Sequence, residues 1–191
     1  MRDRRRNSTR LHPLQDLTRS LQTVPEGAGV YLFFFRGGRA LLRRAGLIRP
    51  HPMLLRTGAG ADLMYIGMSA DAVRRRVKTH LTGDSCASSL RQTLGILLMQ
   101  ELGLTPEPIP LTSRFHFGEG ERRLTDWMVD RGFVLVIGSH VPESDEARLI
   151  RVLEPPLNIT GRRRSPGARH LLVLRNRYSG RGLTRPDRGR R

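Results

Sequence analysis

The sequence predicts a small α/β domain in which short strands alternate with amphipathic helices. Three apolar runs, over residues 30–35, 63–66 and 133–137, have the length of strands. Two stretches, 88–102 and 121–131, carry apolar residues three or four positions apart, which indicates helices with one buried face. A chain of 191 residues is long enough to bury the core of one domain and to carry extensions as well.

The charge of the chain indicates a polyanionic partner. The formal net charge is +17, which favours nucleic acid and, less often, a membrane surface. Residues 1–24 hold six arginines and two acidic residues, and residues 159–191 hold eleven arginines and one acidic residue. Most of the charge therefore lies in the two tails. Lys78 is the single lysine; a codon bias explains this arginine usage better than selection for bidentate phosphate contacts.

Cysteine usage and hydropathy point to a cytoplasmic, soluble protein. Cys86 is the single cysteine, which excludes an intramolecular disulfide. The basic N-terminus is not followed by the apolar region of a signal peptide, and no run approaches the roughly 18 apolar residues of a membrane span. We expect a flexible basic extension over residues 1–24 that contains a short helical turn near 14–21.

The first strand follows a turn at residues 25–29. Alternation along this strand places Tyr31 on the same face as Phe33 and Phe35. The arginine-rich stretch 36–62 contains several glycines and prolines and predicts a solvated surface loop, with a substrate-contacting flap as the alternative.

The second strand leads through Gly67 into a helix for which Ser69 is the expected N-cap. The helical face that begins at Val73 continues through Arg76, Val77 and His80. A guanidinium and an imidazole on a buried face need partners or a ligand, so this face predicts a functional site. Outside it, Arg74, Arg75 and Lys78 are expected to be solvated.

The middle of the chain predicts core scaffolding. Ser88 is the expected N-cap of a helix that ends at Gly103. Prolines at 106, 108 and 110 predict an extended linker before a short strand at 115–117. The helix 121–131 carries Trp127 on its buried face and stops at Gly132, and the run 133–137 reads as a central strand covered on both faces.

The last predicted helix of the domain again has a charged residue on its buried face. Ser144 is the expected cap, and the inward positions are Glu146, Leu149, Ile150 and Leu153. The prolines at 155 and 156 end this helix and place Asn158 where its amide can bind the core backbone. Beyond it we expect an arginine-rich extension, 159–191, with one further strand at 170–175 and disorder elsewhere.

Five separated motifs resemble the GIY-YIG nuclease family. They are Gly29-Val30-Tyr31, Tyr65-Ile66-Gly67, the pair Arg76 and His80, the helix of Glu146, and Pro155-Pro-Leu-Asn158. They occur in the order that the family shows, across roughly residues 25–158, which makes chance agreement far less probable than for one short pattern. The resemblance implies a domain over 25–158 with a short central antiparallel three-stranded sheet flanked by helices.

The resemblance also implies the roles of individual residues. The implied catalytic residues are Tyr31, Tyr65, Arg76, His80 and Glu146. Glu146 would hold one divalent ion, Mg²⁺ or Mn²⁺, for which a single carboxylate with water and phosphate is a suitable donor set. Gly29, Gly67 and Asn158 would support the site structurally. Arg75 is the alternative to Arg76, which we favour because it lies four residues before His80 on the same face.

These observations predict a metal-dependent endonuclease that hydrolyses phosphodiester bonds and nicks one strand of DNA, with RNA as the less favoured substrate. Basic residues expected to contact nucleic acid are Arg74, Arg75, Lys78, Arg162, Arg163 and Arg164. One alternative is a basic protein that binds DNA or RNA on the same fold without cutting it. Another is an RNA-binding protein of the ribosomal kind, whose tails become ordered on RNA.

Overall fold

A four-stranded antiparallel sheet forms the centre of the computed structural model, which describes residues 10–47 and 55–181. The strand order is β1-β6-β2-β3. The strands are β1 (Leu11–Pro13), β2 (Gly29–Arg36), β3 (Ala61–Ser69) and β6 (Gly132–Gly138). The predicted α/β class and the three predicted strands are confirmed, and β1 adds a fourth strand at the edge.

The two interior strands are covered on both faces, which explains their continuous apolar sequences. Along β2, Tyr31, Phe33 and Phe35 point into the larger core, whereas Leu32 and Phe34 point into a smaller core on the opposite face. The central position predicted for residues 133–137 is therefore confirmed.

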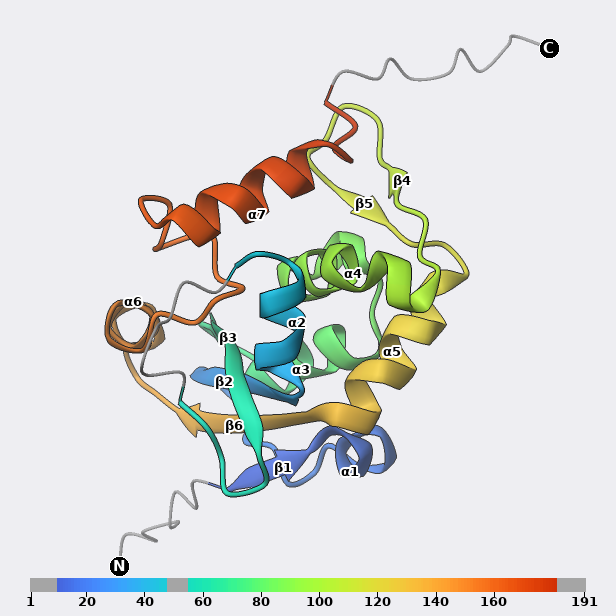
Figure 1. Cartoon of the computed structure of the whole chain (residues 1–191). Helices are drawn as coiled ribbons and strands as arrows, with labels where there is room; N and C mark the ends of the chain where they lie inside the picture. Colours follow the sequence, from blue (N-terminus) through green and yellow to red (C-terminus); the bar gives the residue numbers. More distant parts are fainter. Residues whose placement is uncertain (1–9, 48–54, 182–191) are drawn as a thin grey trace, which may run out of the picture.

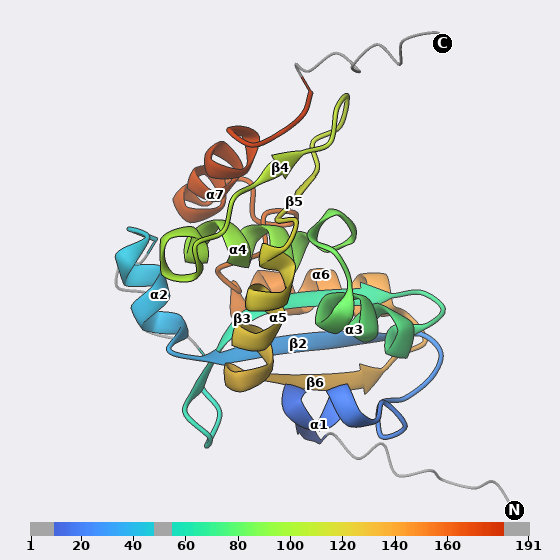
Figure 2. The same cartoon turned by 90° about the vertical axis from the view of Figure 1, so that its right-hand side faces the viewer.

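The helices cover the two faces of the sheet unequally (Figures 1 and 2). On the larger core lie α1 (Leu14–Arg19), α2 (Gly38–Arg44), α3 (Val73–Thr82), α4 (Ser89–Leu102) and α5 (Gly120–Arg131). The other face is covered by α6 (Pro142–Leu153). An outer helix, α7 (Pro166–Asn176), packs on α4 near a small hairpin of β4 (Glu107–Pro108) and β5 (Phe115–His116).

The helix signals at the start and end of α4 are confirmed. The Ser88 side chain accepts a hydrogen bond from the backbone N–H of Arg91, and Gly103 ends the helix in the left-handed conformation with φ of 58°. Trp127 is buried in the core, as predicted.

Two other expected caps are wrong. Strand β3 continues to Ser69, and helix α3 begins at Val73; the Ser69 hydroxyl instead accepts from the N–H of Ala72 in the connecting turn, at 3.1 Å. Helix α6 begins at Pro142, two residues before Ser144. Proline suits the first helical position because its fixed φ matches the helix and its missing N–H needs no partner there.

The N-terminal segment is part of the fold, so the prediction of a flexible extension is wrong for residues 10–24. Strand β1 pairs with β6, and Leu14, Leu17 and Val24 are buried in the core. Residues 1–9 lie outside the described part of the chain. The short helical turn expected near 14–21 is confirmed by α1.

Residues 36–62 are not a simple surface loop. Helix α2 occupies Gly38–Arg44 and buries Leu41 and Leu42 in the larger core. Asp62 is buried and forms ion pairs with Arg39 and Arg56. Of the arginine-rich stretch, residues 48–54 lie outside the described structure, and the alternative of a substrate-contacting flap stays a prediction.

The C-terminal strand prediction is wrong. Residues 170–175 belong to α7, which Ser165 caps by accepting from the N–H of Ala168. Residues 162–164, which were expected to be disordered, form the turn that leads into this helix. Within residues 10–47 and 55–181, no helix combines the length and apolarity needed to cross a membrane.

The burial of α1 side chains in the core can be tested by mutation. Leu14 is fully buried, so Leu14→Ala should lower the free energy of unfolding by about 2 to 5 kcal/mol, as large-to-small core substitutions do. Chemical denaturation measures the change. The exposed neighbour Gln15 provides the control, since Gln15→Ala should stay within about 0.5 kcal/mol. Equal stabilities of wild type and Leu14→Ala would contradict this packing.

Candidate functional site

The two motif tyrosines lie on the same face of adjacent strands. Tyr31 in β2 is paired with Gly67 in β3, and Tyr65 is paired with Phe33. The register shifts between Phe33 and Phe34, so that Met64 is an extra residue in β3. Because side chains alternate along a strand, this bulge sets which face Tyr65 takes. The residues between the two motifs therefore do not separate the tyrosines.

Gly67 and Gly29 are required by close approach. A Cβ at Gly67 would collide with the ring of Tyr31, which crosses directly over it. A Cβ at Gly29 would lie 2.6 Å from the carbonyl oxygen of Ile137 in β6. Both glycines thus serve the packing around Tyr31 and its strand, as a supporting role in the site requires.

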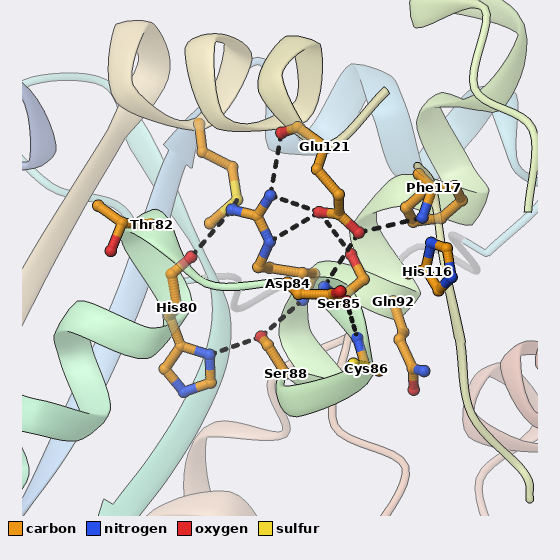
Figure 3. A network of polar contacts seen from close by, with 12 residues as sticks. His80, Thr82, Asp84, Ser85, Cys86, Ser88, Gln92, His116, Phe117 and Glu121 are labelled. Carbon is orange, nitrogen blue, oxygen red and sulfur yellow. Dashed lines mark hydrogen bonds and ion pairs between the residues drawn. The ribbon is translucent and has the colours of Figure 1, made fainter. Parts of the chain in front are cut away.

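A buried chain of hydrogen bonds links Tyr31 to two helices. The Tyr31 hydroxyl lies 2.8 Å from Nε2 of His80 in α3, and Nδ1 of His80 lies 2.7 Å from the Ser88 hydroxyl before α4. Figure 3 shows the second of these contacts. All three side chains are buried. The predicted inward position of His80 is confirmed, and Ser88 is a site residue that sequence reasoning identified only as a cap.

His80 is neutral in this environment. Burial, together with the nearby charges of Arg76 and Arg91, lowers its pKa well below the usual range. The neutral imidazole carries one proton, so its ring donates one of the two hydrogen bonds, to Ser88 or to Tyr31, and accepts the other. The Ser88 oxygen also accepts from the N–H of Arg91.

The Tyr31 hydroxyl is protonated in the free protein. Burial raises its pKa, the neighbouring Tyr65 raises it further, and the charge and hydrogen bond of Arg76 act in the opposite direction. Burial likewise raises the pKa of Tyr65, again against the charge of Arg76. The Tyr31 oxygen therefore keeps its proton while it lies beside His80 and Arg76.

Arg76 projects from α3 between the tyrosines and the turn that follows the helix. Its side chain is half-buried, and Nη1 donates to the carbonyl of Ala87 at 2.9 Å. Within the described residues no carboxylate forms an ion pair with it. Its guanidinium therefore keeps donors for a ligand, whereas Arg75 is exposed and paired with Asp71.

Glu146 reaches the same place from the helix on the opposite face of the sheet. It lies on the inward side of α6 and is half-buried. Burial and the neighbouring Glu143 raise its pKa, while the charge of Arg76 lowers it. Its own charge in turn raises the pKa values of Tyr31 and Tyr65. Tyr31, Tyr65, Arg76 and Glu146 are thus electrostatic neighbours, and His80 is connected to them through Tyr31 and Arg76.

Asn158 forms the backbone tie that the sequence predicted. Its Oδ1 accepts from the N–H of Ile66 at 2.9 Å, and its Nδ2 donates to the carbonyl of the same residue at 2.8 Å. The side chain thereby satisfies the free edge of β3 between Tyr65 and Gly67. Asn158 is buried and supports the strand that carries the second tyrosine.

An ion pair that sequence reasoning missed lies directly behind His80. Arg91 in α4 is fully buried, and its Nη2 lies 2.6 Å from the Glu121 carboxylate of α5. Its Nη1 donates to the carbonyls of His80 and Leu81 in the last turn of α3. Periodicity assigns each of the two residues to the core or to the surface of a helix and does not indicate that they pair. The one available signal was that a charged residue such as Arg91 on a buried helical face needs an opposite charge nearby.

The basic residues predicted to contact nucleic acid differ in their availability. Arg75, Lys78, Arg163 and Arg164 are exposed. Arg74 is engaged by the Glu26 carboxylate and by the carbonyl of Val24 at 2.8 Å. Arg162 donates to the carbonyl of Pro155 at 2.7 Å. Contact with nucleic acid stays a prediction for all six residues.

The donor set of the site fits one divalent ion that is shared with a substrate. Glu146 is its carboxylate, and the described residues contain no cluster of three or more His, Cys, Asp or Glu side chains that could hold a metal alone. Mg²⁺ is commonly held by one or two carboxylates with water and substrate phosphate. Such an ion would also offset the electrostatic cost of a half-buried carboxylate.

Comparison with known proteins identifies the domain. The family model described as the GIY-YIG catalytic domain matches residues 29–177. The matched region contains both tyrosine motifs, Arg76, His80, Glu146 and Asn158 and extends through α7. Neither the curated proteins nor the solved structures provide a match to the chain.

The state of His80 predicts how stability depends on pH. Its pKa in the folded protein is lower than the unfolded value of about 6.5, so the unfolded state binds the proton more tightly. Below pH 6.5 this group should therefore lower the free energy of unfolding by up to about 1.4 kcal/mol per pH unit. Denaturation between pH 7 and pH 5 should show a smaller loss of stability for His80→Asn than for wild type.

The exposed His170 of α7 provides the matched control for this comparison. His170→Asn should keep the wild-type pH dependence. Identical pH dependence for His80→Asn and wild type would show that His80 is not held neutral by the fold.

Proposed function

Because the chain belongs to the GIY-YIG family, a family of endonucleases, we propose that it is a metal-dependent endonuclease that hydrolyses phosphodiester bonds in nucleic acid. The observation that carries the proposal is the convergence of Tyr31, Tyr65, Arg76, His80 and Glu146 from four elements. A guanidinium with donors to spare and a half-buried carboxylate beside two phenols suit a phosphate ester and one divalent ion.

Arg76 binds the scissile phosphate in this proposal. Its anchor on the Ala87 carbonyl fixes the side chain while other guanidinium nitrogens face the site. A preoriented guanidinium stabilises the charge that develops on the phosphoryl oxygens without having to reorganise during the reaction.

Tyr31 orients and activates the attacking water. Its hydroxyl is hydrogen-bonded to His80 and lies within reach of Arg76. Before the attack Tyr31 releases its proton to bulk solvent, and His80 and Arg76 beside its oxygen stabilise the phenolate. The phenolate oxygen then accepts the proton of the attacking water, which is left as hydroxide. Tyr65 supplies a second hydroxyl beside the phosphate, and Asn158 keeps its strand in place.

Glu146 is the residue that would hold the divalent ion, Mg²⁺ or Mn²⁺. When bound, the ion neutralises charge on the phosphoryl oxygens and on the departing oxygen. One carboxylate beside one Arg76 forms a single hydrolytic centre, and we therefore propose one cut in one strand per event, with DNA as the favoured substrate.

Loss of the carboxylate tests the metal site. Glu146→Ala should abolish nicking of supercoiled plasmid in Mg²⁺ or Mn²⁺ while retaining binding to the same DNA, because the phosphate contacts come from basic residues. Gel separation of supercoiled and nicked plasmid measures the effect. Glu143→Ala, an exposed change one turn away on α6, should keep nicking.

Absence of cleavage by the wild type on duplex, branched and RNA substrates would favour the alternative of a binding protein on this fold. Cleavage that Glu146→Ala retains would show that the ion is held elsewhere.

Neighbouring arginines on α3 test which guanidinium serves the phosphate. Arg76→Ala should lower kcat by about 10²- to 10³-fold, the usual effect of removing one donor to a developing oxyanion. Arg75→Ala should change kcat by less than about threefold, because its side chain is exposed and paired with Asp71. Single-turnover cleavage measures both, and the reverse ranking would assign the phosphate to Arg75.

A further inference from the structure

Helix α4 presents two polar anchors on one face, of which the catalytic residues use only the first. Ser88 holds His80, and four residues later Gln92 holds Arg175 of α7 at 2.5 Å. Residues four apart on a helix lie on the same face, about one turn along the axis. Arg175 is therefore anchored about one helical turn from the anchor of the catalytic histidine.

The core fixes the orientation of the Gln92 side chain, and Gln92 in turn fixes the Arg175 guanidinium. Gln92 is fully buried, and its Nε2 donates to the carbonyl of Phe115 at 2.9 Å. That bond turns Oε1 toward the guanidinium of Arg175. A buried amide with both ends satisfied costs little to keep. Among the residues that the structure describes, Gln92 is the one hydrogen-bond partner of the Arg175 side chain.

A second arginine joins Arg175 from the hairpin that precedes α5. Arg114 Nη1 donates to the carbonyl of Cys86 at 2.7 Å, next to the Ala87 carbonyl that anchors Arg76. Consecutive carbonyls of the short helix η1 (Ser85–Ala87) thus anchor two guanidinium groups. Arg175 lies within electrostatic range of both Arg114 and the Tyr65 hydroxyl.

Among the described residues this group of arginines forms no ion pair, although Glu146 lies within electrostatic range of Arg76. In the described ranges no carboxylate is ion-paired with Arg76, Arg114 or Arg175. Arg175 is also half-buried, and burial and Arg114 lower its pKa. Like charges that a fold holds together and partly desolvates are unfavourable until an anion binds between them.

We infer that Arg175, anchored on Gln92, and Arg114, anchored on Cys86, bind the phosphate adjacent to the scissile one. The inference rests on the proposed function, because Arg76 takes the scissile phosphate. Neighbouring phosphates of one strand then bind to the guanidinium groups of Arg76 and Arg175, whose charges both act on Tyr65. The substrate is accordingly a polynucleotide that the protein contacts at two or more phosphates, and α7 is part of the binding site.

The test couples the arginine to one phosphate of the DNA. Duplexes are prepared with a neutral methylphosphonate at either phosphate flanking the cleavage position, and binding is measured by fluorescence anisotropy without divalent metal, so that no cut occurs. With Arg175 intact, one of the two neutralised duplexes should bind about tenfold more weakly, the effect of losing one charge-assisted contact. For Arg175→Gln, the same neutralisation should cost less than about twofold.

Arg169→Gln, an exposed change on the same helix, controls for the loss of one charge from α7, and it should retain the full tenfold effect. Arg114→Gln, at an exposed side chain, should reduce the effect without endangering the fold. A Tm of Arg175→Gln within about 2 °C of the wild-type Tm would confirm that this variant is folded. If each methylphosphonate weakens binding by the same factor in wild type and in Arg175→Gln, the inference is wrong.

A separate measurement keeps this inference distinguishable from the endonuclease proposal. The slope of log affinity against log salt concentration, measured on unmodified duplex, should become less steep by about 0.9 for Arg175→Gln, because one phosphate contact is lost. For Arg169→Gln the slope should stay unchanged. This slope needs no cleavage. If wild type fails to nick but the slope changes, the endonuclease proposal fails and the phosphate contact remains; if wild type nicks and the slope is unchanged, the contact is absent.

Discussion

The buried ion pair between Arg91 and Glu121 is the constraint on which the site depends. Arg91 has no exposure to solvent, and a charge in such a place is tolerated only when its donors are satisfied and an opposite charge is close. Glu121 provides the charge, and the carbonyls of His80 and Leu81 take further donors. The end of α3 is thereby fixed, and with it the imidazole that contacts Tyr31.

The same carboxylate also organises the turn before α4. Glu121 accepts from the backbone N–H and the hydroxyl of Ser85 and from the N–H of Phe117 (Figure 3). This turn supplies the carbonyls of Cys86 and Ala87 that anchor Arg114 and Arg76. One buried pair therefore positions a histidine on one side and two guanidinium groups on the other, which links the interior charge to the groups that would meet a phosphate.

Local signals predicted the elements that depend on their own residues. The strands of Tyr31 and Tyr65, the helix between Ser88 and Gly103, and the tie of Asn158 follow from apolar runs, a cap and a chain reversal, which act over a few positions. The failures have the opposite character. Apolar residues at 170–175 suit either a strand or a helix, and packing on α4 chose the helix. Leu41 and Leu42 give α2 too few apolar residues to show a period.

The sequence alone determined which site residues are present and in which order: Tyr31, Tyr65, Arg76, His80, Glu146 and Asn158. It also determined the four-residue spacing that places Arg76 and His80 on one helical face. Both are local properties of the chain. Tertiary structure decided the protonation of His80 and Tyr31, which depends on burial by distant segments. It also decided that Gln92 and Arg175, 83 positions apart, meet beside the site. A pairing of that kind arises only when α7 packs on α4, and no local pattern encodes it.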